Sequence, residues 1–375
     1  MHGITYEGSI KIKTPKAEKI SKEMQVFYNP IMSLNRDISV LLLNSINKKN
    51  LQIADPLAAT GVRSIRFLKE LTKNKIKKIY INDYNKDAIR LIKENLIFNK
   101  INYKNNKKII IKNQDANLFL LNSTGFDYID IDPFGSPNFF LDAACRRIAR
   151  DGILAVTATD TSALCGTFPK ACIRKYWATP KKDVIMHETG LRILIRKIQL
   201  VASQYDKALT PIFSYSKEHY MRVFLRNEKG KNKVDEVLKQ HGYFNSAGPL
   251  WLGNLWDKNL CSKIYNESSK NRILNKNNEL IKFLRTIKEE SKIKSVGFYD
   301  LHDICENPKK PKVFWNLKIL NFQVNKIKHL QKKETIINKI KKIGYKASDT
   351  HFKGEGIRSN IPFNKLIKIL KSKNQ

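Results

Sequence analysis

The chain has 375 residues, which is long for a single hydrophobic core, so we expect two domains. Lysine and arginine number 70 against 34 aspartates and glutamates, and the net charge of +36 indicates a polyanionic partner, with nucleic acid ahead of an acidic membrane surface. No apolar run reaches the roughly 18 residues of a membrane span, and the N-terminus lacks the apolar core of a signal peptide. We therefore expect neither a membrane-spanning nor an exported protein, but a cytoplasmic one.

Strand and helix patterns alternate through the first 226 residues. Residues 1–30 are basic and mixed, and a helix is predicted over 31–46. Strands are predicted at 51–54, 78–81, 108–112, 128–131 and 152–157, and helices at 62–72, 86–99, 138–149 and 189–204. A hairpin of 210–214 and 220–226 follows. This order predicts a doubly wound α/β sheet, and the antiparallel finish favours a Rossmann-like methyltransferase sheet over a dehydrogenase.

The chain is organised around residues 129–137, IDIDPFGSP, where a buried strand ends in Asp132, Pro133, Phe134 and Gly135. Ligands bind at this edge of open α/β sheets. A carboxylate here suits methylation of an exocyclic amine on a nucleobase, because it can accept the N–H bonds and take the proton. Pro133 fixes the backbone so that its carbonyl can accept a second N–H, and Phe134 offers a flat face to an unstacked base. The alternative is an ordinary turn, in which Asp132 caps a helix and Phe134 packs.

The other predicted strands end in residues that could hold a nucleoside cofactor. Gly61 and its small neighbours let the backbone approach a ligand beside a helix N-terminus, although the loop is not a GxGxxG fingerprint. Asp83 can hold both ribose hydroxyls or cap the following helix. Asp115 can take the amino group of an adenine or act as a cap. Asp160 lies at the same edge and could touch the substrate.

Several residues have plainer interpretations. Arg36 falls on the polar side of its helix and reads as a solvated surface arginine. The basic face of helix 189–204, with Arg192, Arg196 and Lys197, is expected to be solvated or to face phosphates. The five cysteines are scattered and include no CxxC, so we expect neither a disulfide framework nor a zinc site. Cys165 is interpreted as a small packing residue.

In order along nearly the whole chain, the sequence resembles the tRNA guanine-N2 dimethyltransferase family. The strongest match is 131–137, IDPFGSP, and the others lie at 26–30, 34–37, 59–66, 82–83, 157–160, 166–167, 187–188, 219–223, 247–251 and 350–352. The resemblance implies transfer of one or two methyl groups from S-adenosylmethionine to the exocyclic N2 of guanine 26 in tRNA.

The resemblance also implies roles for particular residues. Asp132 would be the catalytic carboxylate, next to Pro133, and Phe134 and Phe27 would enclose the guanine. The cofactor would be held by Arg36, Arg66, Asp83, Asp115 and Ala116, with Arg63 a further candidate and Gly61 in the adjoining loop. The implied partner is tRNA, and no obligate protein partner is expected.

The sequence departs from the family at 227–247, where many members carry two cysteine pairs spaced as a zinc site. This stretch has no cysteine, and His241 alone cannot build a tetrahedral site, so we predict no zinc. Residues 227–375 are expected to form a smaller, basic α+β domain that grips tRNA phosphates. Helices are predicted at 280–287 and 336–343, and core positions for the aromatic residues Trp251, Trp256, Phe298, Tyr299 and Trp315.

Two other functions stay open at this point. One is a catalytically inactive, basic tRNA-binding or folding factor. The other is pyrimidine C5 methylation of RNA with Cys165 as the nucleophile, which needs a thiol at the end of the fourth or fifth strand. The fourth strand offers Asp132 instead.

Overall fold

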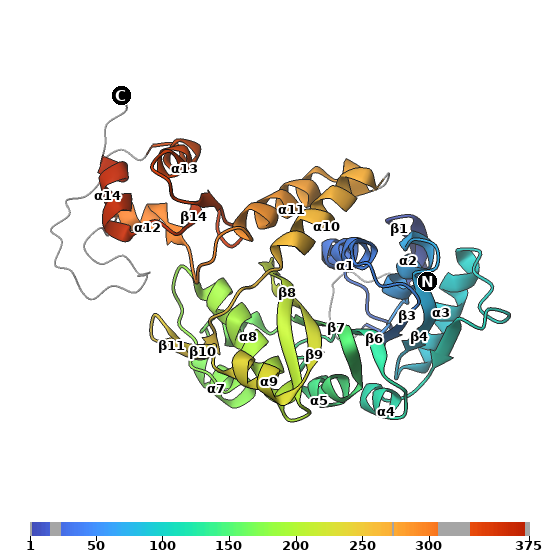
Figure 1. Cartoon of the computed structure of the whole chain (residues 1–375). Coiled ribbons are helices and arrows are strands. Elements are labelled where there is room, and N and C mark those ends of the chain that lie inside the picture. The colour runs from blue at the N-terminus through green and yellow to red at the C-terminus, as the bar shows by residue number, and fades with distance from the viewer. Residues whose placement is uncertain (1, 16–23, 272–273, 307–330, 372–375) are drawn as a thin grey trace.

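The computed structural model describes residues 2–15, 24–271, 274–306 and 331–371 (Figure 1). At its centre is a seven-stranded sheet with the strand order β5-β4-β3-β6-β7-β9-β8. Strands β3 to β7 pair in parallel, and the β8–β9 hairpin joins β7 antiparallel. The bounds are β3 Leu51–Asp55, β4 Ile76–Asn82, β5 Ile109–Lys112, β6 Phe126–Ile131, β7 Ile148–Ala158, β8 Lys207–Lys217 and β9 Tyr220–Lys229. The predicted fold class is therefore confirmed.

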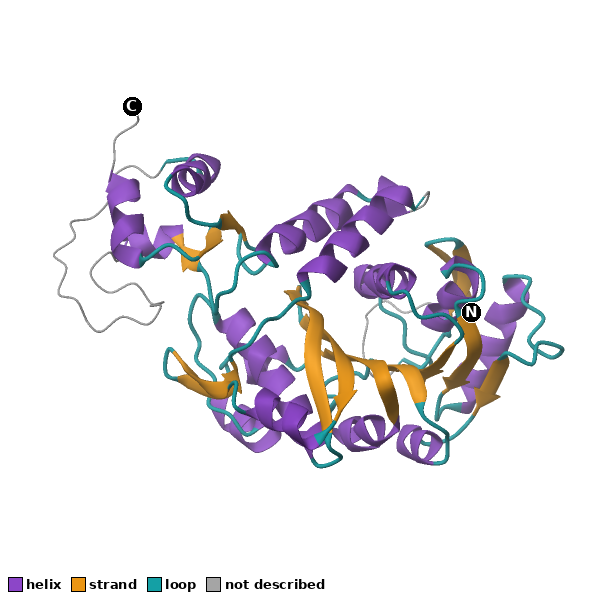
Figure 2. Ribbon diagram, in the orientation of Figure 1, coloured by secondary structure: helices purple, strands orange, loops and turns teal. Residues whose placement is uncertain are grey.

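Helices cover both faces of this sheet (Figure 2). On one face α1, α2 and α3 contact one another in turn, and on the other face α4, α5 and α8 do so. Their bounds are α1 Ser33–Ser45, α2 Val62–Glu70, α3 Lys86–Phe98, α4 Ala116–Leu121, α5 Asn138–Arg147 and α8 Met186–Ser203. None of the described helices combines the length and apolar character that crossing a bilayer demands.

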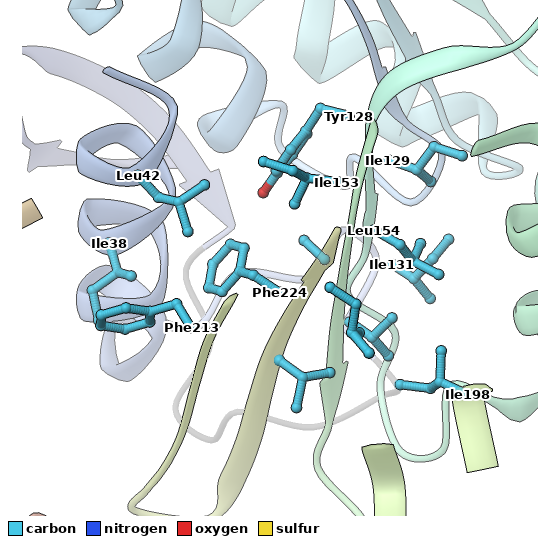
Figure 3. Packing of buried hydrophobic residues seen from close by; sticks show 14 of the residues in the cluster. Ile38, Leu42, Tyr128, Ile129, Ile131, Ile153, Leu154, Ile198, Phe213 and Phe224 are labelled. Atoms are coloured by element: carbon cyan, nitrogen blue, oxygen red, sulfur yellow. The ribbon is translucent and has the colours of Figure 1, made fainter. Parts of the chain in front are cut away.

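The main core lies between the sheet and these two helical layers. Because β6 and β7 are covered on both faces, residues 128–131 and 152–158 are buried without interruption, Asp130 among them. Figure 3 shows Tyr128, Ile153 and Phe224 on the side of α1, together with Ile38 and Leu42, and Ile129, Ile131 and Leu154 on the side of Ile198. This packing fixes the strand ends that carry the predicted site.

The N-terminal segment, for which no element was predicted, forms a hairpin of β1 His2–Glu7 and β2 Ile10–Pro15. Side-chain amides of α3 replace a partner strand along β2: Asn95 accepts from Lys13 N at 2.7 Å and Asn99 accepts from Lys11 N at 3.1 Å. The docked hairpin places Glu7, which is only 6% exposed, inside the domain. The docking of this hairpin against α3 could not be predicted from local sequence patterns.

The second half of the chain continues the first core before it starts another. Buried side chains of α9 Lys231–Leu238, β11 Ala247–Trp251, α10 Lys258–Lys270 and α11 Asn278–Glu290 belong to the main cluster. A separate cluster runs from Tyr299 to Leu370 over β12 Tyr299–Asp300, α12 Leu301–Glu306, α13 Lys333–Lys342, β13 Ala347–Asp349, β14 Gly356–Ser359 and α14 Phe363–Lys371. The division at 226/227 therefore stays a prediction.

Two helices and four buried aromatic residues predicted in this half are confirmed. The expected helices correspond to α11 and α13, and Gly344 follows α13 with a φ of +88°. Trp251, Trp256, Phe298 and Tyr299 are buried, whereas Trp315 lies outside the described residues.

A buried ion network links the two clusters. Arg358 of β14 donates to Glu188 of α8 at 2.6 Å and to Glu290 of α11 at 3.0 Å. Arg192, expected on a solvated face, is 1% exposed and pairs with Glu188 at 2.9 Å. That expectation was wrong because helical periodicity cannot show that a distant segment covers this face: Arg192 also donates to the Trp251 and Gly253 carbonyls at 3.0 and 2.8 Å.

Candidate active site at the carboxyl edge of the sheet

A cavity of about 520 Å³ opens at the carboxyl ends of the parallel strands. Its lining comes from the segments 27–36, 55–63, 132–135, 159–160 and 218–220. This volume is typical of small-molecule sites. Of the predicted site residues, Phe27, Arg36, Arg63, Asp132, Pro133 and Phe134 line it.

Asp132 follows directly on β6 and is held by an arginine from α2. Arg63 donates from Nη2 to the Asp132 carboxylate, and its Nη1 donates to Asn35 at 3.2 Å and to Ser39 at 3.0 Å. Because Asn35 and Ser39 belong to α1, three elements fix the guanidinium. The direction of the Asp132 side chain is therefore set by buried structure.

A second carboxylate, Asp130, lies two residues before Asp132 on β6, and its oxygens are paired with arginines and a tyrosine. It accepts from Arg222 at 2.7 Å and from the Tyr128 hydroxyl at 2.6 Å, and Arg63 lies 3.3 Å away. Burial would raise the pKa of Asp130, but Arg222 and Arg63 outweigh it and lower that pKa. Asp130 thus anchors the two arginines, and of these two carboxylates Asp132 is the one that lines the cavity.

The loop after Asp132 is pinned to β7. Gly135 N donates to the Thr159 hydroxyl at 2.6 Å, and Thr159 N donates to the Gly135 carbonyl at 3.0 Å. Gly135 has a φ of +91°, a conformation that favours glycine. The plainer interpretation was wrong: α5 begins after Pro137 without a side-chain cap, and Phe134 is 58% exposed.

Phe134 forms an aromatic corner with Phe27 from the N-terminal segment. The ring centroids lie 5.6 Å apart and the ring planes meet at 82°, an edge-to-face arrangement. Both rings line the cavity. Two nearly perpendicular aromatic faces beside a carboxylate can hold a flat base and present its edge to that carboxylate.

The loops after β3, β4 and β5 are tied together by Asn82. Its side-chain amide donates to the Pro56 and Gln114 carbonyls at 3.0 and 2.9 Å, and its carbonyl oxygen accepts from Gln114 N at 3.1 Å. Gly61, at a φ of +75°, ends the first loop in the left-handed conformation that begins α2. Gly61 stands beside the cavity without lining it.

Asp83 braces the same loop. It accepts from Ala59 N at 2.8 Å and from Asn85 N at 2.9 Å, and burial raises its pKa. The residue that caps α3 is Asn85, which accepts from Asp87 N, so the alternative role given to Asp83 was wrong. Asp83 does not line the cavity, but Ala59, whose backbone it holds, does.

Arg36 is buried, contrary to its interpretation as a solvated arginine. It is 5% exposed and donates from Nε and Nη2 to Glu7, both at 2.6 Å. Burial would raise the pKa of Glu7, but Arg36 and Arg66 outweigh it and lower that pKa to about 2. Arg36 lines the cavity. Among the described residues its hydrogen bonds use Nε and Nη2, so Nη1 is available to a ligand.

The structure places Arg66, Asp115 and Ala116 away from the cavity lining. Arg66 is fully buried and pairs with Glu7 at 3.1 Å, Asp37 at 2.6 Å and Glu70 at 2.8 Å. Asp115 is exposed and caps α4 by accepting from Asn117 N and Leu118 N, and Ala116 begins that helix. Their contacts with a cofactor stay predictions, while the capping role of Asp115 is confirmed.

Sequence reasoning missed Glu7, Tyr28 and Asp55. Tyr28 and Asp55 line the cavity, and Tyr28 donates to Glu7 at 3.1 Å. Asp55 closes β3 just as Asp132 follows β6, so its position at a strand end was a usable signal. Glu7 had no local signal, because its role depends on a hairpin docked against residues far along the chain.

Asp55 should make the folding stability depend on pH. Burial raises the pKa of Asp55 to about 7 from 3.8, with Arg63 partly offsetting it. Between these values the folded state holds a proton that the unfolded chain releases, so this group lowers the free energy of unfolding as pH rises from 4 to 7. We expect Asp55→Asn to gain in urea midpoint relative to the parent protein as pH rises from 5 to 7. Parallel pH profiles for the two proteins would contradict this.

The cysteine chemistry considered as an alternative finds no support. Cys165 is buried, lies 3.5 Å from His187 Nδ1 and does not line the cavity. Burial raises the pKa of its thiol to about 12, so the reactive thiolate is disfavoured. Its interpretation as a packing residue is confirmed.

Within the described ranges, no group of three or more His, Cys, Asp or Glu side chains is placed to hold a metal ion. The ring of His241 instead lies 2.8 Å from the side-chain oxygen of Gln199.

The strand order, the antiparallel hairpin and a cavity across the ends of β3 and β6 define a Rossmann-like methyltransferase. The model of the N2,N2-dimethylguanosine tRNA methyltransferase family matches residues 8–246 and 242–371, and the chain belongs to this family.

Several relatives match over nearly their whole length. The tRNA (guanine(26)-N(2)/guanine(27)-N(2))-dimethyltransferase of Aquifex aeolicus is 37% identical over 97% of this chain and 95% of its own. The tRNA (guanine(26)-N(2))-dimethyltransferase of Pyrococcus horikoshii is 38% identical over 97% of both. The structure of Trm1 from Pyrococcus horikoshii with S-adenosyl-L-methionine superposes with a TM-score of 0.84 at 35% identity, covering 98% of this chain and all of that one.

Proposed function

We propose that this protein transfers one or two methyl groups from S-adenosylmethionine to the exocyclic N2 of guanine 26 in tRNA. The observation that carries the proposal is Asp132, fixed by Arg63 and facing a cavity beside the Phe27–Phe134 corner. Membership of the N2,N2-dimethylguanosine family supports the reaction, and the names of the relatives support position 26.

The residues at one end of the cavity fit the cofactor. Arg36 offers a guanidinium nitrogen, and the apolar side chains Met32, Leu57 and Ala58 line the wall beside it. Asp83 follows β4 and does not line the cavity, but it holds the lining residue Ala59 and has lone pairs beyond its bonds to Ala59 N and Asn85 N, which suits ribose hydroxyls. S-adenosylmethionine supplies an electrophilic methyl group when bound. We propose that Arg36 and Asp83 hold it, with Arg63 positioning Asp132 and Arg66 acting through Glu7.

Asp132 would act on the substrate amine. The lone pair of N2 in guanine is delocalised into the ring, so the nitrogen is a poor nucleophile until its N–H bonds are oriented. The carboxylate accepts one N–H and the Pro133 carbonyl the other, which turns the lone pair toward the methyl donor. When the N–C bond forms, the nitrogen gives up a proton, and Asp132 accepts it or passes it to water. The flat faces of Phe27 and Phe134 hold the unstacked base.

Replacing Asp83 should weaken cofactor binding and spare tRNA binding. We expect Asp83→Ala to raise the Kd for S-adenosylmethionine about 10- to 100-fold, because two hydrogen bonds to a charged group are lost. Isothermal titration calorimetry measures this, with Asp235→Ala on exposed α9 as the matched control. An unchanged Kd in Asp83→Ala would remove this residue from the cofactor site.

Transfer of a labelled methyl group tests the position on tRNA. Transcripts with guanosine at positions 26 and 27 should accept label, and replacing guanosine 26 with adenosine should abolish it. Label retained on guanosine 27 alone would instead match the Aquifex aeolicus relative, whose printed name includes that position. No label on any transcript, although S-adenosylmethionine binds, would favour the inactive tRNA-binding factor. We propose that the basic residues 227–375 grip tRNA phosphates in either case.

A further inference from the structure

Next to the cavity the protein exposes large apolar side chains around α7 Pro169–Tyr176. Phe168 precedes this helix and is 62% exposed, Trp177 ends it at 51%, and Phe139 at the start of α5 is 81% exposed. We call these three rings the stacking patch. Exposed aromatic rings gathered in one region of a surface indicate a binding role.

Hydrogen bonds join α7 to the catalytic loop. The Tyr176 hydroxyl donates to Asp160 at 2.6 Å and lies 3.1 Å from the Ser136 hydroxyl. Asn138 at the start of α5 donates to the Lys175 carbonyl at 2.8 Å. Because Asp160 lines the cavity, these bonds connect the cavity wall with α7, which has Phe168 and Trp177 at its two ends, and with the start of α5, which carries Phe139.

The charge of this segment suits a polyanion. Residues 161–182 contain five cations and no aspartate or glutamate. Lys170, Arg174 and Lys182 are exposed, while Lys175 lies 3.3 Å from Asp160. Lys197, expected on the solvated or phosphate-facing side of its helix, is only 6% exposed and lies over one face of the Trp177 ring, 2.8 Å from its centroid, so a base would stack on the other face. Aromatic faces interleaved with cations are characteristic of surfaces that bind unpaired nucleic acid.

We propose that the stacking patch holds the tRNA nucleotides that flank the target guanine. Taking a guanine out of its stack leaves its neighbours with an uncovered face. The rings of Phe139, Phe168 and Trp177 cover those faces, and the exposed cations of α7 contact the adjoining phosphates. This inference rests on the proposed function and adds a substrate-positioning surface outside the cavity.

Steady-state kinetics with alanine variants tests the proposal. We expect Phe168→Ala and Phe139→Ala each to raise the KM for tRNA about tenfold, the usual cost of one lost base–aromatic stack. The kcat at saturating tRNA and the Kd for S-adenosylmethionine should not change. Phe168→Tyr should restore the KM because it keeps a ring. The matched control is Tyr6→Ala, whose ring is 76% exposed on β1, in the separate N-terminal hairpin.

Fluorescence gives an independent measurement. Of the three tryptophans in the described residues, Trp251 and Trp256 are buried and Trp177 is exposed, so stacking on Trp177 should appear as the part of the tRNA-dependent quenching that Trp177→Phe removes. A KM for Phe168→Ala and Phe139→Ala equal to that of Tyr6→Ala would overturn the proposal. The proposal would also be overturned if the parent protein were a dimer and these variants were monomers with an unchanged KM, because the rings would then contact a second copy of the chain. Both results concern the variants only. The proposed function is tested separately, by the methylation activity of the parent protein.

Discussion

Asp132→Asn is expected to slow methyl transfer about 10²- to 10⁴-fold, the range that a positioned proton acceptor contributes. Asparagine has nearly the same size, and its carbonyl oxygen can still accept from Arg63, so the fold and the buried network should persist. Its amide nitrogen is a donor and cannot accept the N–H of the amine. Single-turnover rates at saturating tRNA and S-adenosylmethionine measure the effect, and binding of both substrates should be unchanged.

The matched control for this variant is Asp160→Asn. Asp160 also lines the cavity, but it accepts from the Tyr176 hydroxyl and lies beside Lys175. We expect a much smaller effect on the single-turnover rate. If Asp132→Asn transferred methyl groups at a near-normal rate and Asp160→Asn lost most of its activity, the proton acceptor would be Asp160 and not Asp132.

Arg358→Met should be the most destabilising substitution outside the cavity. Arg358 is fully buried and pairs with Glu188 and Glu290, and methionine would leave both carboxylates without this partner. Breaking a buried ion network by removing one member costs about 3–5 kcal/mol of unfolding free energy. The urea midpoint measures the loss.

The control is Arg285→Met on α11, where the arginine is exposed. Its midpoint should stay within the small range usual for surface changes. If Arg358→Met unfolds at the same urea concentration as Arg285→Met, the buried network contributes nothing measurable to stability.

Much of the sheet was predictable because its information is local. Runs such as 128–131 are mostly apolar over the length of one strand, and Asp83, Asp132 and Asp160 follow their strands within two residues. The connection rules of parallel sheets then bring those residues to one edge. The structure confirms that Asp132 and Asp160 lie at the same edge of the sheet, because both line one cavity.

The partners of buried charges could not be predicted in the same way. Periodicity put Arg36 and Arg192 on polar helix faces, yet Glu7 and Glu188 neutralise them in the interior. Glu7 precedes Arg36 by 29 residues in sequence and reaches it only when the β1–β2 hairpin docks. The Glu7–Arg36 pair therefore depends on tertiary packing. Glu188 and Arg192 lie one helical turn apart, so their pairing has a local pattern, and only its burial depends on distant segments.

The proposed reaction is methylation of the exocyclic amine of one guanine. The decisive measurement is mass spectrometry of nucleosides from tRNA that carries inosine at position 26, since inosine differs from guanosine only by lacking that amine. With guanosine at 26, incubation with S-adenosylmethionine should yield N2-methylguanosine and N2,N2-dimethylguanosine, and with inosine it should yield no methylated nucleoside at that position. Methylation of the inosine-containing tRNA at position 26 would contradict the account.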